Sequence, residues 1–212
     1  MAKNQPLSPS KIGKFQELLG AVLRKSVMFD DEAQDVIENH WPELREVIEP
    51  ALLKTINEFL EQRRNTIIRI VPRMDCTRTP QAVLDATGRH YYPNPSVINT
   101  MPAIDSGILE NVEVVFFRLG RDVDDVELVR EYEKRGLVSH PYAQAWVNEA
   151  DPAFADEHPN CTHWENGEGG WYFLSFFRQA SERCVRADLV VMHWGRGFWF
   201  AGVRKSDLVA KK

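Results

Sequence analysis

The sequence predicts an α+β fold, in which an N-terminal helical layer packs on a mainly antiparallel sheet that ends in a three-stranded C-terminal meander. Apolar residues recur at three- and four-residue intervals through residues 1–65, which is the helical period. β-Branched residues dominate from residue 66 onward, and residues 170–205 hold three apolar segments with short separations. We therefore expect a helical lobe at 1–65 and an α+β region at 66–212, together forming one continuous domain.

The N-terminal lobe is predicted to contain three helices. Ser8 and Pro9 suit a cap and a first turn, Asp30 opens a short second helix, and Pro42 begins a long third one. The apolar stripe of the third helix, which ends near Leu60, is regular over more than two heptads. Two interpretations stay open: the stripe packs on the core, or it forms the seam of a homo-oligomer.

The middle region is predicted to alternate short strands and helices. β-Branched and aromatic runs indicate strands, whereas a cap residue with proline or an acidic first turn indicates a helix start. The expected elements, in chain order, are a strand at 66–71, a helix from Thr79 and Pro80 to Gly88, a brief strand at 96–100, a strand at 111–119, and helices beginning at Asp122 and at Pro141.

Three successive strands are predicted at the C-terminal end, at 170–179, 183–191 and 196–205. Short connections between them favour an antiparallel meander. In the first of these strands both alternating sets of side chains are apolar, so both of its faces should be covered. We expect the N-terminal helical layer to provide that cover.

Composition points to a soluble, cytoplasmic protein. The chain has no apolar run long enough to span a membrane and no signal-peptide core at its N-terminus. Its three cysteines are widely spaced, which favours reduced thiols. The net charge of −5 is unevenly distributed: residues 104–168 carry 15 acidic and 5 basic side chains, and residues 169–212 carry 3 and 8. The two segments either form an acidic and a basic surface or neutralise each other.

Residues 73–92 form the best candidate ligand site in the sequence. Arg73, Arg78 and Arg89 lie close to a helix start at Thr79, where backbone N–H groups and guanidinium groups favour an anion. Tyr91 adds an aromatic ring. The resulting hypothesis is a binding or interaction protein for a small phosphate- or carboxylate-bearing ligand. The competing interpretation is structural, with Thr79 as a simple cap and the arginines paired to the acidic segment.

An enzyme is the second class of function. Cys76 lies between arginines near a helix start, which is an environment that lowers a thiol pKa and favours a nucleophile. His90 or His193 could act as its base, but no sequence feature brings them together. The alternative is a buried structural cysteine.

Two further hypotheses concern zinc and nucleic acid. His158, Cys161 and His163 are three potential zinc ligands within six residues, although the spacing matches no recognised zinc motif. The C-terminal strands also interleave arginines with aromatic residues, as sheets that bind single-stranded nucleic acid do, although the chain as a whole is acidic. These arginines are Arg178, Arg183, Arg186, Arg196 and Arg204.

Overall fold

The long helix predicted from Pro42 is present. The computed structural model describes residues 39–92, 94–102, 107–190, 193–205 and 208, and the predicted helices at Ser8 and Asp30 lie outside these residues. The chain divides into two units, Met1–Phe59 and Leu60–Lys212. Helix α3 (Trp41–Arg64) begins in the first unit and ends in the second.

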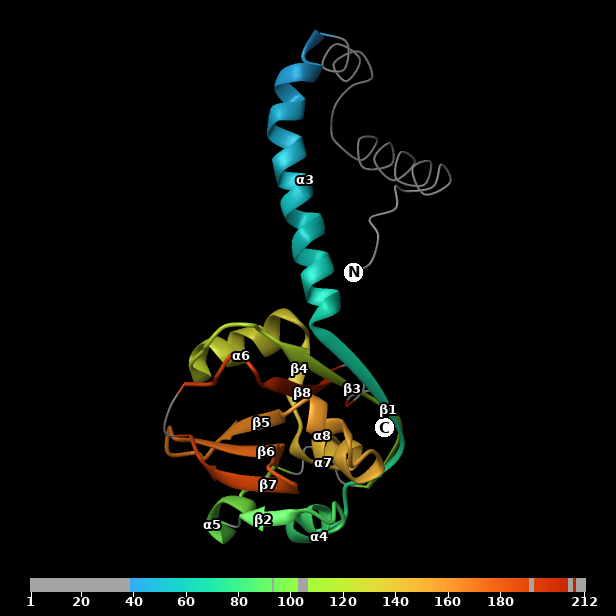
Figure 1. The fold of residues 1–212 in the computed structure, drawn as a ribbon, viewed down its shortest axis with the longest axis vertical. Helices are drawn as coiled ribbons and strands as arrows, with labels where there is room; N and C mark the ends of the chain where they lie inside the picture. Colours follow the sequence, from blue (N-terminus) through green and yellow to red (C-terminus); the bar gives the residue numbers. More distant parts are fainter. Residues whose placement is uncertain (1–38, 93, 103–106, 191–192, 206–207, 209–212) are drawn as a thin grey trace. The chain divides into compact units, whose positions relative to one another are not determined.

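One mixed sheet of eight strands dominates the second unit (Figure 1). Its order is β1-β3-β8-β5-β6-β7-β2, with β4 paired to β8, and only the β2–β7 and β5–β8 pairs are parallel among the described strands. Together with the helices this confirms the α+β class and the mainly antiparallel sheet. The strands are β1 (Thr66–Asp75), β2 (His90–Tyr92), β3 (Ile108–Arg118), β4 (Leu137–Ser139), β5 (Asn160–Glu165), β6 (Trp171–Gln179), β7 (Glu182–Leu189) and β8 (Trp199–Arg204).

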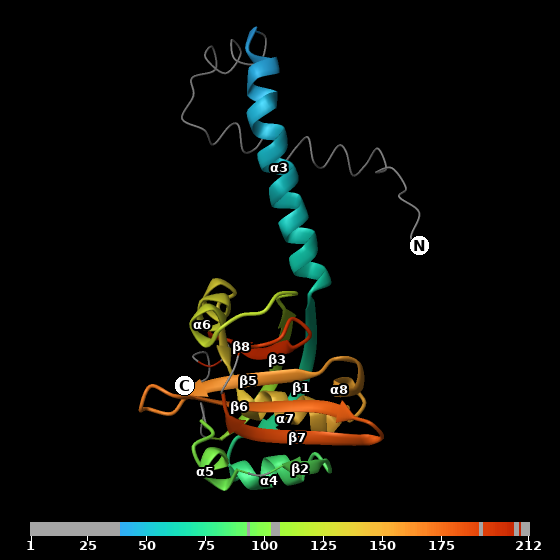
Figure 2. The ribbon, with the colours of Figure 1, turned by 60° about the vertical axis from the view of Figure 1, so that its left-hand side comes forward.

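A three-stranded antiparallel meander is present, but its members are β5, β6 and β7, which lie side by side in Figure 2. The strand predicted at 196–205 as the third member of the meander contains β8, which instead lies between β3 and β5. The reason is the connection between β7 and β8, which is longer than a hairpin turn and pairs Trp194 with Val123 on the way.

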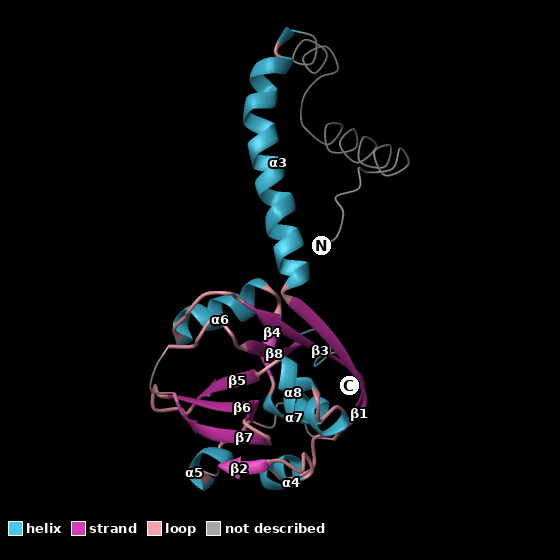
Figure 3. Ribbon diagram, viewed as in Figure 1, coloured by secondary structure: helices cyan, strands magenta, loops and turns pink. Residues whose placement is uncertain are grey.

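Within the second unit, the described helices that pack on the sheet follow residue 79 in the chain (Figure 3). Four of them contribute to the larger core cluster, on one face, and α6 packs on the smaller cluster of the other face. In β6, Phe176 belongs to the larger cluster and Phe173 packs against the smaller one, so both faces are covered in this part of the strand. At the end of the strand Gln179 is exposed, so the expected cover on both faces does not extend along all of β6. The helices are α4 (Pro80–Asp85), α5 (Pro95–Ile98), α6 (Asp125–Lys134), α7 (Pro141–Ala150) and α8 (Phe154–Glu157).

Two local predictions are wrong. Residues 96–100, predicted as a strand, belong mainly to α5, because Pro95 occupies the first helical turn, where its missing N–H is not needed. Residues 160–165, for which the sequence predicts no strand, form the buried strand β5. Its polar side chains hid the strand pattern, since they are buried through hydrogen bonds and not through apolar character.

Helix α6 begins three residues later than predicted. Asp124 caps it, its carboxylate accepting from the Glu127 N–H at 2.7 Å, while the Glu127 side chain returns to the Asp124 N–H. None of the described helices is both long enough and apolar enough to cross a membrane.

Candidate functional site

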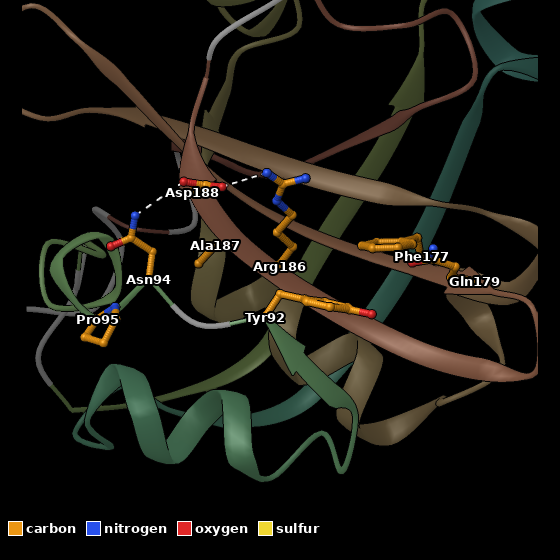
Figure 4. A pocket seen from close by; sticks show the side chains of 8 residues that line it. All are labelled: Tyr92, Asn94, Pro95, Phe177, Gln179, Arg186, Ala187 and Asp188. Carbon is orange, nitrogen blue, oxygen red and sulfur yellow. Dashed lines mark hydrogen bonds and ion pairs between the residues drawn. The ribbon is translucent and has the colours of Figure 1, made fainter.

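A hollow of about 580 Å³ lies on the open face of β2, β6 and β7 (Figure 4). Side chains on a strand alternate between faces, and most of the strand side chains that line this hollow lie on the face opposite α7. These are Tyr92, Phe177, Gln179, Arg186 and Asp188. Its volume is within the range of roughly 300–1,000 Å³ that is typical of small-molecule sites. The side chains that shape it are two aromatic rings, Tyr92 and Phe177, and four polar groups, Asn94, Gln179, Arg186 and Asp188.

The charged groups of this hollow neutralise each other. The Arg186 guanidinium donates to the Asp188 carboxylate at 2.7 Å, and the Asn94 amide donates to the same carboxylate at 3.3 Å, as Figure 4 shows. The bond from Arg186 is the main cause that lowers the pKa of Asp188. Asp188 therefore stays ionised at neutral pH, and the pair contributes no net charge.

Tyr92 and Phe177 provide the flat surfaces of the hollow. The Tyr92 side chain is 42% exposed, and its hydroxyl points to the side where Phe177 and Gln179 lie (Figure 4). His90 contacts Tyr92 edge to face, with ring centroids 5.1 Å apart. Since residues two apart on a strand share a face, the run "HYY" places His90 and Tyr92 on the open side and Tyr91 on the other.

The predicted arginine turn does not converge on one site. Thr79 caps α4, accepting from the Ala82 N–H at 3.2 Å, but α4 has only six residues. Arg78 donates to Glu149 at 2.9 Å, and its guanidinium lies 4.3 Å from the Trp146 ring centroid. These contacts are the ones expected from the structural interpretation of the turn.

The other three residues of that prediction point in different directions. Arg89 is 9% exposed, donates to Asn148 and to the Pro152 carbonyl, and lies over the Phe176 ring. Tyr91 is partly buried and packs against the larger core cluster. Arg73 is exposed on β1 and lines a different, apolar hollow beside α7.

Cys76 is a buried residue of the larger core cluster, 5% exposed. His90 and His193, the two candidate bases, are both exposed. The structure thus places the thiol and its candidate bases in different environments. A core position of this kind restricts the access that a nucleophile needs.

The three candidate zinc ligands have different surroundings in the structure. Cys161 is fully buried, and this desolvation raises the pKa of its thiol well above the usual value. His163 lies on the same face of β5 but contacts the Asp125 carboxylate through Nδ1 at 3.1 Å. His158 lies among the rings of Phe154 and Trp199. Across the described part of the chain, no group of three or more His, Cys, Asp or Glu side chains is placed to hold a metal ion.

Sequence reasoning missed the cluster around His163. Its ring stacks on Trp171, with centroids 4.6 Å apart, and the Asp125 carboxylate that it contacts also accepts from the Trp194 indole N–H at 2.9 Å. The cluster ties the start of α6 to the sheet. It could not be found from the sequence because its members lie on separate elements between residues 125 and 194 and follow no motif.

The C-terminal arginines do not share one surface. Arg178 and Arg183 both pair with Asp156 of α8 on the α7 side of the sheet, whereas Arg186 lies on the opposite face with Asp188. Arg204 pairs with Glu113. Most of the positive charge expected to meet a phosphate backbone is therefore already paired.

The sequence signals for the open hollow were present but dispersed. In the sequence, Arg186 is one of several arginines in the C-terminal strands, and Asn94, Gln179 and Asp188 follow no motif. Only the pairing of β2 with β7 brings Tyr92 opposite Arg186. No protein-family model, curated protein or solved structure matches this chain.

Proposed function

We propose that the chain is a binding protein for a small ligand with a flat, uncharged heteroaromatic ring of the nucleobase type, bound in the hollow of β2, β6 and β7. The observation that carries the proposal is that two aromatic rings, Tyr92 and Phe177, line the same hollow as a charge-neutral Arg186–Asp188 pair. Stacking of a base on an aromatic side chain contributes about 1–3 kcal/mol per base.

The polar groups suit the edge of such a ring. The amides of Asn94 and Gln179 each offer a donor and an acceptor, which is the pattern with which Asn and Gln bind adenine. One N–H of the Asn94 amide already donates to Asp188, which leaves its second N–H and its oxygen for the ligand. Because Arg186 is neutralised, a phosphate on the ligand should add little to its affinity.

A titration with adenosine and with AMP tests this proposal. Ligand-observed NMR on the full chain should detect adenosine binding, with an AMP affinity within about threefold of it. Arg186→Gln should weaken adenosine binding. Arg204→Gln is the matched control, since Arg204 is also exposed and also pairs with one carboxylate of the sheet, Glu113, and it should bind as the wild type does. Absence of adenosine binding, or equal effects of the two variants, would contradict the proposal.

A second proposal, self-association through α3, rests on its exposed apolar side chains. Leu53, Ile56 and Phe59 are 53%, 37% and 57% exposed. The helix has an acidic first turn and two arginines in its last turn, so an antiparallel pair with a second copy brings opposite charges together. Light scattering after size exclusion should show a dimer that an Ile56→Glu/Phe59→Glu variant loses and that the exposed control Gln62→Glu retains. A monomeric wild type would exclude it.

A further inference from the structure

A second hollow, of about 410 Å³, lies between the edge strand β1 and helix α7, which are neighbours in Figure 1. Its walls are largely apolar and include Val71 and Pro72 from β1 and Val147 and Ala150 from α7. The hollow shares no residue with the proposed nucleobase site and lies on the opposite face of the sheet. It is therefore an independent feature.

Two arginines of β1, Arg69 and Arg73, line this hollow, and Asp151 is its single carboxylate. The lining therefore carries one net positive charge. The Arg69 guanidinium lies 4.8 Å from the Phe154 ring centroid, which holds it in place without neutralising it. An apolar cavity with positive charge in its lining fits a molecule with an apolar body and one negative group.

Trp146 adds a second indication of a ligand. It lines the hollow, and its indole Nε1 is buried with no hydrogen-bond partner within the described ranges. Arg78 lies on the ring of Trp146 and so fixes its orientation. A buried donor without a partner is uncommon, and the part of the chain that the structure describes supplies no acceptor for this one.

We propose that this hollow binds a small amphipathic carboxylate, with its apolar body between β1 and α7 and its carboxylate held by Arg69 and Arg73. The site retains Arg73 from the anion site that the sequence predicts, with Arg78 in a supporting position behind Trp146. It does not include Thr79, Arg89 or Tyr91. It does not depend on the proposed nucleobase site.

Decanoate, kept below its micelle-forming concentration, is the probe. Isothermal titration of the full chain should give saturable binding, and the Trp146 indole signal should shift in NMR spectra. Decanol, which has the same chain without the charge, and acetate, which has the charge without the chain, should each bind at least about tenfold more weakly. Equal affinities for decanoate and decanol would overturn the assigned role of the arginines.

Two variants separate charge from shape. Arg69→Gln/Arg73→Gln should weaken decanoate binding by about tenfold or more, and Arg204→Gln should not change it. Ala150→Phe should abolish binding by filling the hollow, and the exposure of Ala150 makes this change compatible with the fold. Wild-type affinity in either variant, or no binding of decanoate to the wild type, would overturn the proposal. Far-UV circular dichroism spectra equal to that of the wild type in both variants would establish that the fold is intact.

Discussion

The Arg186 guanidinium and the Asp188 carboxylate, two residues apart on β7, lie 2.7 Å from each other in the lining of the open hollow. Residues i and i+2 of a strand share a face, so the sequence order alone places the two groups together. Both side chains are partly exposed, at 51% and 32%, and such pairs add little to stability. The consequence of the pair is chemical: it sets the charge that a ligand meets.

Removing the carboxylate should change the ligand preference. Asp188→Asn leaves the Arg186 charge without its counter-charge. We therefore expect the ratio of the AMP affinity to the adenosine affinity to rise by up to about fivefold, corresponding to about 1 kcal/mol. Competition NMR between the two ligands measures the ratio. Glu113→Gln, which removes the partner of Arg204 elsewhere on the sheet, is the control and should leave the ratio unchanged. A ratio equal to that of the wild type in Asp188→Asn would count against the role of the pair.

The ring of Tyr92 should matter more than its hydroxyl. Tyr92→Val removes the stacking surface but keeps a good strand former, and it should weaken adenosine binding by about 1–3 kcal/mol. Tyr92→Phe retains the ring and should bind nearly as the wild type does. Fluorescence or NMR titration distinguishes the two variants. If Tyr92→Phe lost as much affinity as Tyr92→Val, stacking would not be the source of the binding energy.

His140 should make the fold sensitive to acid. It is fully buried at the start of α7, where its Nδ1 accepts from the Ala143 N–H, and desolvation lowers its pKa from 6.5 to about 4. The unfolded chain therefore takes up a proton at a higher pH than the folded chain. This contribution to stability is constant above pH 6.5 and falls as the pH decreases from 6.5 towards 4, by about 3 kcal/mol in all.

Urea unfolding at pH 7.5 and at pH 4.5 measures this effect. His140→Asn keeps a capping acceptor without a titrating ring, so its loss of stability between the two pH values should be smaller than that of the wild type by about 2 kcal/mol. His90→Asn, at an exposed histidine, is the control. Its loss of stability between the two pH values should be close to that of the wild type. Identical pH dependence in His140→Asn and wild type would contradict the assignment.

A buried network of polar side chains should also contribute to the stability of the fold. Asn160 Oδ1 accepts from the Gln144 and Asn148 amides at 2.9 and 3.0 Å, and Thr162 donates to Gln144 Oε1 at 2.7 Å. Thr162→Val leaves that oxygen buried without a donor, which should lower the free energy of unfolding by about 1–3 kcal/mol. The same change at Thr66, whose hydroxyl bond is exposed, should cost less than about 0.5 kcal/mol. Chemical denaturation compares the two variants, and similar losses would exclude the proposed role of the network.

Local signals predicted the starts of α4 and α7 correctly. The proline at the start of α7 and the Thr79–Pro80 cap of α4 are read from neighbouring residues, and both helices begin where expected. Strand β5 was missed because its buried polar side chains are paired by α7, a partner that no local pattern reveals. The position of β8 was missed for a similar reason, since strand order depends on contacts between distant segments.

The candidate sites likewise depend on contacts between segments that are distant in the sequence. Arg73, Arg78 and Arg89 are close in sequence, yet β1, the turn before α4 and the turn before β2 direct them into three different environments. Tyr92 and Arg186, which are far apart in the sequence, lie directly opposite each other because β2 pairs with β7. Clustering along the chain was thus a weaker guide to a site than pairing in the sheet.

The most direct test of the proposed function is an adenosine titration followed by the side-chain amide signals of Asn94 and Gln179. Both amide signals should shift along one saturating curve, and Arg186→Gln should weaken the affinity that this curve gives. The side-chain amide of Gln81, which donates to Asp85 on the exposed surface of α4, should not move. Shifts confined to other regions of the chain, or no shift at saturating adenosine, would contradict a nucleobase site between β2, β6 and β7.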